Sequence, residues 1–168
     1  GIIGLTGSAT AYGFYNARKG PKVIKENIFL KNLPPEFENY KIAQISDLHV
    51  GPTIKIPYVE KVFDTIANVN PDMIAVTGDL VDGSVENLRS DLEPFKDMIA
   101  KDGTFFVTGN HEYYSGVDRW LDETDRLGMI NLINSNSIIE KQEGKICIAG
   151  ITDFRAHQIK NSHRSNPK

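Results

Sequence analysis

Three short stretches of this chain combine carboxylate, imidazole and amide side chains within a few residues of one another. They supply Asp47 and His49, then Asp79 and Asp82, and then Asn110, His111 and Glu112. Oxygen and imidazole-nitrogen donors suit hard or borderline divalent metals such as manganese, iron or zinc, and they suit copper(I) or an iron–sulfur cluster poorly. Two metals held about 3.5 to 4 Å apart by a bridging carboxylate can clamp both reacting oxygens of a phosphoryl displacement. These residue types therefore favour hydrolysis of a phosphate ester.

Each stretch alone also has an ordinary structural explanation. Asp47 and Asp79 are of a type common in turns and helix caps, and Gly109-Asn110 is a common turn pair. Asp82 either supports a metal ligand, His49 or Asn110, through a hydrogen bond or caps a helix. Taken together, the three stretches favour a common binding site over three separate turns, because all of them follow short apolar runs.

These apolar runs predict buried strands at 41–46, 72–78 and 104–109. Helical spacing predicts helices at 56–69, at 84–100 with a bend at Pro94, and at about 116–127, where Ser115 and Asp118 have the spacing of a capping box. Residues 27–33 contain a strand-like piece, and two or three further strands with a turn at Glu143-Gly144 follow residue 129. In an open α/β sheet ligands bind beyond the carboxyl ends of the strands, so the three polar stretches are expected to meet.

Composition narrows the classes of function. The 168 residues, 40% hydrophobic and 24% charged, are typical of one domain with a real core. A net charge of −3 provides no broad cationic field, so nucleic acid is not an expected partner. Cys147, the single cysteine, stands in the apolar run "KICIAGI" and is predicted to lie in the core. A dinucleotide-binding protein is disfavoured, because no G-x-G-x-x-G follows a predicted strand.

The N-terminal residues differ from the rest. Residues 1–17 carry no charge, and Arg18, Lys19, Lys22 and Lys25 follow closely. This pattern is typical of the C-terminal part of a membrane-spanning helix, which would place the domain on the cytoplasmic side by the positive-inside tendency. The Ala9-Thr10-Ala11 spacing alternatively fits the cleavage site of a secretory signal, which would place the domain outside. A loose terminus is the third reading, because glycine and threonine keep the segment weakly apolar.

The succession "DLH", "GDLVD" and "GNHE", with one strand–helix unit between neighbours, resembles the calcineurin-like metallophosphoesterases over about residues 41–154. The resemblance implies an α/β fold, a β-sandwich flanked by helices, of which this chain holds the N-terminal part of the αββα architecture. It implies two divalent metal ions: Asp47 and His49 bind the first, Asp79 bridges both and Asn110 binds the second.

The resemblance also implies roles around the metals. His111 would protonate or steady the leaving oxygen, and Glu112 would orient His111. A hydrophobic N-terminal segment and a proline-containing connector before "SDLH" are similar to the bacterial membrane-associated branch, which includes enzymes that cleave the pyrophosphate of a UDP-linked diacylglucosamine. The implied partners are a phosphoester, phosphodiester or pyrophosphate, lipid-linked or not, and a membrane contacted by the N-terminal segment.

The expected division of the chain has four parts. They are a hydrophobic N-terminal segment at 1–19, a partial membrane anchor or signal; a connector at 20–40; the N-terminal portion of the metallophosphoesterase domain at 41–156; and a polar tail or loop at 157–168. The family completes its site downstream with a lone His and a Gly-His-x-His motif, and the chain ends at Lys168 without either. His157 and His163, in the polar tail, are not expected to be ligands.

The chain is therefore expected to be truncated and its second metal site weak. The alternative to a phosphoesterase is a catalytically inactive remnant or interaction module of the same fold.

Overall fold

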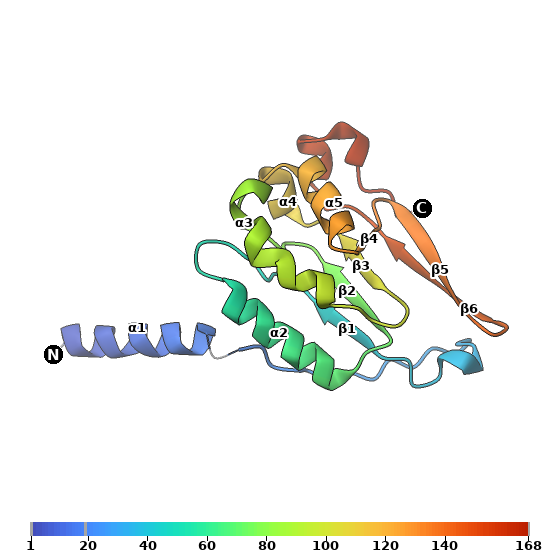
Figure 1. Ribbon diagram of the computed structural model, residues 1–168, viewed down its shortest axis with the longest axis horizontal. Coiled ribbons are helices and arrows are strands. Elements are labelled where there is room, and N and C mark those ends of the chain that lie inside the picture. Colours follow the sequence, from blue (N-terminus) through green and yellow to red (C-terminus); the bar gives the residue numbers. More distant parts are fainter. Residues whose placement is uncertain (1, 19, 168) are drawn as a thin grey trace.

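The fold is built around a parallel sheet of four strands in the order β1-β2-β3-β4, seen in a computed structural model that describes residues 2–18 and 20–167. The strands are β1 (Ile42–Ile45), β2 (Met73–Thr77), β3 (Thr104–Val107) and β4 (Ile130–Asn131). The helices that connect them are α2 (Ile56–Val69), α3 (Val85–Leu92), α4 (Asn110–Tyr114) and α5 (Val117–Arg126). An antiparallel hairpin, β5 (Ser135–Lys141) and β6 (Gly144–Gly150), forms a second sheet (Figure 1).

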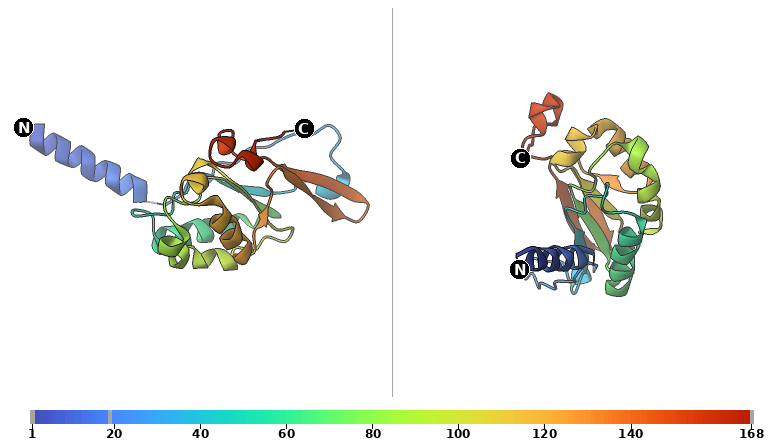
Figure 2. Two further views of the ribbon diagram at one scale, coloured as in Figure 1. Left: turned by 90° about the horizontal axis from the view of Figure 1, so that it is seen from above. Right: turned by 90° about the vertical axis from the view of Figure 1, so that its left-hand side faces the viewer.

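The two faces of the parallel sheet are covered differently. Ile74 and Val76 of β2 and Phe106 of β3 pack in a core with the helices, while the alternate residues Met73 and Phe105 pack in a second core with the hairpin. Figures 1 and 2 show the helices on one side of the sheet and the hairpin on the other. Burial on both faces explains why these strands read as continuous apolar runs. The arrangement confirms the α/β fold of a sheet flanked by helices and packed on a second sheet.

The predicted helix at 56–69 and the first three strands are confirmed, but some boundaries differ. The helix predicted at 84–100 ends at Leu92 and continues as the 3-10 turn η2 (Glu93–Asp97), because Pro94 cannot donate a helical hydrogen bond. The capping box at Ser115 is wrong, since α5 begins after Gly116 in a left-handed conformation with φ of 96°. The hairpin turn lies at residues 142–143, one residue earlier than predicted.

The prediction that Cys147 lies in the core is wrong. Cys147 is exposed and pairs with Ile138 across the hairpin, whereas its neighbours Ile146 and Ile148 pack toward the parallel sheet. An antiparallel hairpin with one covered face turns alternate residues outward. An apolar run alone could not show that only one face of this hairpin is covered.

The N-terminal part consists of helix α1 (Ile2–Arg18) and a connector. Among residues 2–18 and 20–167, none of the helices is long and apolar enough to cross a membrane. Residues 20–30 form neither helix nor strand, which contradicts the predicted strand-like piece at 27–33. The connector returns to the core at the 3-10 turn η1 (Pro35–Phe37), where Phe37 is fully buried. At the other end of the chain two 3-10 turns, η3 (Ala156–Gln158) and η4 (Asn161–His163), follow the hairpin.

A charged network that the sequence did not reveal ties the helices together. Glu123 of α5 is 1% exposed, and its carboxylate accepts from Arg89 of α3 (Nη2 to Oε2, 2.9 Å) and from Arg126 (Nε to Oε2, 3.0 Å). Arg126 also contacts Glu93 of η2 at 2.7 Å. The hydrogen bond from Arg126, together with Arg89, lowers the pKa of Glu123 although burial acts against this.

Glu123→Gln is expected to lower the free energy of unfolding at neutral pH by about 2 kcal/mol, because a buried anion shared by two partly exposed arginines is lost. A carboxyl whose folded pKa is depressed stabilises the fold above its unfolded pKa, about 4.3, and this stabilisation is lost as the pH falls through the folded pKa. Urea unfolding of both proteins from neutral to acid pH measures the effect. The difference in the free energy of unfolding between the parent protein and Glu123→Gln should shrink below about pH 4. A difference in unfolding free energy that does not change with pH would contradict a stabilising role for the Glu123 charge. An equal loss of stability in the exposed control Glu60→Gln would contradict it as well.

Candidate metal centre

The loops after β1 and β2 run side by side beyond the ends of the strands. The backbone N–H of His49 donates to the carbonyl of Asp79 at 3.0 Å, and that of Val50 donates to the carbonyl of Leu80 at 2.9 Å. The N–H of Asp82 then donates back to the carbonyl of Val50 at 2.8 Å. These bonds hold the first two polar stretches of the sequence against each other.

The third stretch joins them through two glycines. A Cβ on Gly78, whose φ is 86°, would lie 2.5 Å from the backbone nitrogen of Gly109, and a Cβ on Gly109 would collide with the Asp79 carboxylate. Only glycine allows the two backbones to approach so closely. The approach lets Oδ1 of Asp79 accept the backbone N–H of His111 at 3.0 Å, at the start of α4.

Three of the polar residues have a left-handed backbone. The φ angles of Asp47, His49 and Asp79 are 54°, 50° and 49°. Such conformations cost non-glycine residues on the order of 1 kcal/mol or more each, and they persist where the surroundings fix them. Their concentration at the ends of two neighbouring strands indicates a functional site.

The side chains converge on one point. His49, Asp79 and His111 each offer a ligand atom, and these atoms lie within 4.8 Å of one another. The rings of His49 and His111 meet edge to face with centroids 4.4 Å apart. Oδ1 of Asp47 lies 3.9 Å from Nε2 of His49, and its side chain is largely exposed at the edge of the group. Asn110, half-buried, is the first residue of α4.

Asp82 lies beside His111. Its Oδ1 is 3.3 Å from Nδ1 of His111, so the carboxylate favours a proton on Nδ1 and leaves Nε2 as the other ring atom available to the site. The sequence left open whether Asp82 caps a helix or supports a ligand. The structure places it in support of an imidazole, but of His111 and not of His49 or Asn110.

Glu112 is 1% exposed and holds the loops by their backbones. Its Oε2 accepts the N–H groups of Gly109 at 2.7 Å and Asp79 at 3.1 Å, and its Oε1 accepts that of Leu80 at 2.8 Å. Burial raises the pKa of Glu112, while these three hydrogen bonds act in the opposite direction. Glu112 thus contacts the backbone beside His111, and its orientation of the His111 ring stays a prediction.

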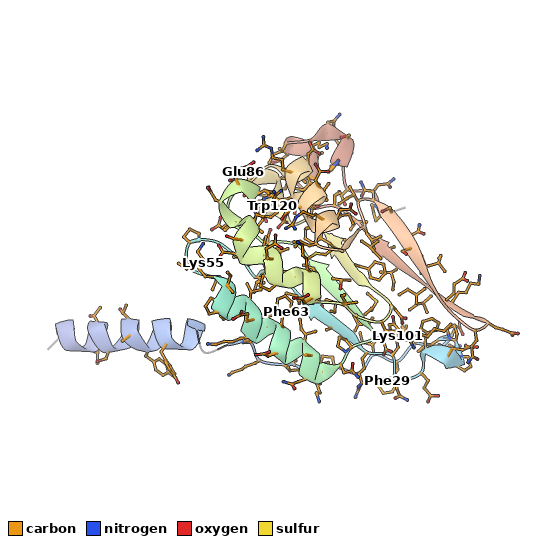
Figure 3. The ribbon with its side chains drawn as sticks, viewed as in Figure 1. Phe29, Lys55, Phe63, Glu86, Lys101 and Trp120 are labelled. Atoms are coloured by element: carbon orange, nitrogen blue, oxygen red, sulfur yellow. The ribbon has the colours of Figure 1, made fainter. Side chains whose placement is uncertain are left out.

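The aromatic residues near the site divide into two groups. Trp120 (labelled in Figure 3) and Tyr113 are buried, and the Trp120 indole N–H donates to the carbonyl of Gly83 at 3.1 Å. Tyr114 is 64% exposed and its ring centroid lies 5.9 Å from that of His111. Packing explains the first two, and only Tyr114 faces the site.

The two histidines of the tail contact other groups. Nδ1 of His163 lies 2.9 Å from the hydroxyl of Tyr113, and Nδ1 of His157 lies 3.2 Å from the carbonyl of Phe154. Burial lowers the pKa of His163, which favours its neutral form. Within residues 2–18 and 20–167, the group of His, Asp, Glu or Cys side chains placed to hold a metal is that of His49, Asp79 and His111. Its nitrogen and carboxylate donors, half-buried at strand ends, fit a divalent metal.

Comparison with known proteins identifies the domain, since residues 40–164 match the model of the calcineurin-like phosphoesterases. The chain belongs to this family. The parallel sheet, the hairpin and the group of His49, Asp79 and His111 thus lie in a calcineurin-like phosphoesterase domain. The match starts at the end of the connector and includes the three polar stretches, the hairpin and most of the tail.

Relatives of this phosphoesterase domain occur in animals and in bacteria. It is 34% identical over 160 residues to a Danio rerio protein named "Transmembrane protein with metallophosphoesterase domain", with 93% of this chain and 37% of the relative covered. It is 34% identical over 149 residues to an uncharacterized metallophosphoesterase of Helicobacter pylori, covering 89% and 38%. It is 30% identical over 122 residues to a UDP-2,3-diacylglucosamine pyrophosphatase of Chlamydia trachomatis, covering 70% and 36%. The chain thus spans little more than a third of the length of these relatives.

Proposed function

We propose that this phosphoesterase domain hydrolyses a phosphoester, phosphodiester or pyrophosphate with two divalent metal ions, which are manganese, iron or zinc. The observation that carries the proposal is the convergence of ligand atoms of His49, Asp79 and His111, from the loops after β1 and β2 and from the start of α4, to within 4.8 Å. Asp47 and His49 would hold the first ion, Asp79 would be a ligand of both and Asn110 would hold the second. Bound there, the ions supply Lewis acidity for the phosphoryl oxygens and make water nucleophilic at neutral pH.

The residues of the chain then have separate tasks. Asp82 accepts the Nδ1–H of His111 and orients the ring. To protonate the leaving oxygen from Nε2 the ring must carry a proton on both nitrogens, and the Asp82 carboxylate would then balance its positive charge. Glu112 keeps the loop that carries Asp79 at a fixed separation from Gly109, which precedes Asn110 at the start of α4. Tyr114, exposed beside His111, offers a surface for the organic part of a substrate.

A lipid-linked substrate and a membrane location belong to the same proposal. The Chlamydia relative is named for a diacylglucosamine substrate, and the Danio relative is named a transmembrane protein. The uncharged residues 1–17 and exposed side chains of α1, such as Leu5, Tyr12 and Tyr15, support contact with a membrane through this end of the chain. The basic residues that follow favour the cytoplasmic face.

Metal content and turnover test the proposal directly. Elemental analysis of the purified protein, with hydrolysis of bis(p-nitrophenyl) phosphate in added manganese, is expected to show two metals per chain and turnover that a chelator removes. Asp64→Asn, an exposed acid on α2, should behave as the parent protein. One metal or none, without turnover, would instead favour an inactive remnant or interaction module of the same fold.

Asp82→Asn is expected to lower turnover by roughly 10- to 100-fold, the usual range when a hydrogen-bonding partner of a site residue is lost. Metal content should stay unchanged, because Asp82 contacts His111, which is not one of the proposed ligands. The amide carries no charge, so it no longer balances the positive charge of a His111 ring that bears both protons. Turnover and elemental analysis on the same preparation separate the two effects. Loss of metal in parallel with turnover would mean that Asp82 acts on the ligands and not on the acid.

A further inference from the structure

We propose that residues 22–31, called here the basic strip, bind the surface of an anionic lipid membrane. The proposal deepens the membrane part of the proposed function and does not depend on hydrolysis. It adds a second contact to that of α1 and names the lipid charge that the contact requires.

Apolar exposure is concentrated in the basic strip. Five large apolar side chains fall within eight residues and are all exposed, namely Val23 at 48%, Ile24 at 82%, Ile28 at 80%, Phe29 at 93% and Leu30 at 62%. Single exposed apolar residues are ordinary on a protein surface, but a contiguous group marks a site of interaction. A phenylalanine left almost wholly in water beside two other apolar residues favours burial in a lipid interface.

Charge selects the kind of surface. Lys22, Lys25 and Lys31 are interspersed with the apolar residues, and Glu26 is the single acid of the strip. Residues 1–31 contain five basic and one acidic residue, a net charge of +4, whereas the whole chain has −3, so residues 32–168 carry −7. An anionic surface repels the body of the domain and attracts this segment. The charge distribution therefore orients the molecule with the strip toward the lipid.

Both ends of the strip are held against the domain. A Cβ built on Gly20 would lie 3.7 Å from Cδ of Lys61 on α2, so the connector starts close to that helix. At the other end Leu33 packs into the core that contains the buried Phe37. The strip thus runs along the domain between two attachments, as Figure 1 shows below α2 and β1. A binding surface held in place loses less conformational entropy when it docks.

The position of the strip leaves the metal centre open. Figure 1 and the right view of Figure 2 show α4, which begins at Asn110, at the opposite end of the domain from the strip. Figure 3 places the labelled Phe29 at the lower edge of the molecule, away from Trp120. A membrane bound by the strip would not cover the start of α4, which carries His111, or the Asp79 loop that contacts it.

Flotation of the full chain with lipid vesicles tests the inference. The vesicles are phosphatidylcholine alone and an equal mixture of phosphatidylcholine and phosphatidylglycerol. The parent protein is expected to bind the mixture more tightly, and added salt should weaken this binding. Phe29→Ser should weaken binding on the order of tenfold, as expected for a buried aromatic side chain. Replacing Lys22, Lys25 and Lys31 by Ser should weaken binding to the mixture roughly fivefold for each lysine, with no change on phosphatidylcholine.

The matched control is the double variant Ile99→Ser, Lys101→Ser, which removes an exposed apolar residue and an exposed lysine beyond η2. It should bind as the parent protein does. Equal binding of parent and strip variants, or equal binding of the parent to both vesicles, would overturn the inference while leaving α1 as the membrane contact. If the parent protein binds neither kind of vesicle, both proposed membrane contacts, the basic strip and α1, are overturned. A protein surface would then be favoured as the partner of the strip, and the proposed hydrolysis would be unaffected.

Discussion

Asp79→Asn is expected to abolish metal-dependent turnover, with a loss of at least about 10³-fold, since the proposed bridging carboxylate and the metals it would hold supply several kcal/mol of transition-state stabilisation. The substitution is nearly isosteric. Asparagine tolerates the left-handed backbone that residue 79 adopts, with φ of 49°, and its side-chain oxygen can still accept the N–H of His111. The fold should therefore survive while the negative charge of residue 79 is lost.

Thermal unfolding with and without manganese separates these effects. The parent protein should gain about 2.7 kcal/mol of stability at a metal concentration 100 times the dissociation constant, and the variant should gain little. In the absence of metal the variant should be as stable as the parent, or more stable, because one charge leaves a cluster that also holds Asp47 and Asp82. Asp64→Asn serves as the control for loss of an exposed acid. Full manganese stabilisation of Asp79→Asn would remove Asp79 from the metal site.

Glu112→Gln is expected to lower the free energy of unfolding by about 2 to 4 kcal/mol and to weaken metal binding with it. Both oxygens of Glu112 accept backbone N–H groups, so an amide must turn its NH₂ toward a donor. A buried donor left without an acceptor costs about 1 to 3 kcal/mol, and the bonds lost here were made to a charged group. The loop that bears Asp79 and the start of α4, which bears His111, should then separate.

Urea unfolding and manganese titration of Glu112→Gln against Glu60→Gln, which alters an exposed residue of α2, measure this effect. The informative result is a loss of metal affinity under conditions in which the variant is still folded. A folded variant with parent-like metal affinity would show that Glu112 stabilises the fold without positioning the ligands.

Much of the fold was predictable because its signals are local. Helix α2 was predicted at its observed bounds from apolar spacing, and β1, β2 and β3 were predicted from short apolar runs. Errors arose where a boundary depends on neighbours in space. Gly116, and not Ser115, precedes α5, and Pro94 ends α3 instead of bending it.

The candidate site shows the same division. Residue types at strand ends sufficed to select Asp47, His49, Asp79, Asn110 and His111 as a group, since carboxyl ends of parallel strands share one edge. Their assignment to two metal ions remains a proposal. The partner of Asp82 was not available from sequence, because a carboxylate three residues after Asp79 can turn toward any of several side chains.

The sequence by itself therefore determined the alternation of β1, α2, β2, α3 and β3 and the residue types gathered at one edge of the sheet. Only the tertiary structure decided what the buried charges do. Glu112 accepts N–H groups from residues 32 and 33 positions away, and Glu123 pairs with Arg89, 34 positions away. Such contacts follow from how helices and loops pack across the sheet, and a local pattern of residues carries no information about that packing. Packing also explains the error at Cys147. Its apolar run predicted a core position, but Cys147 lies on the face of the hairpin turned away from the parallel sheet, so it is exposed.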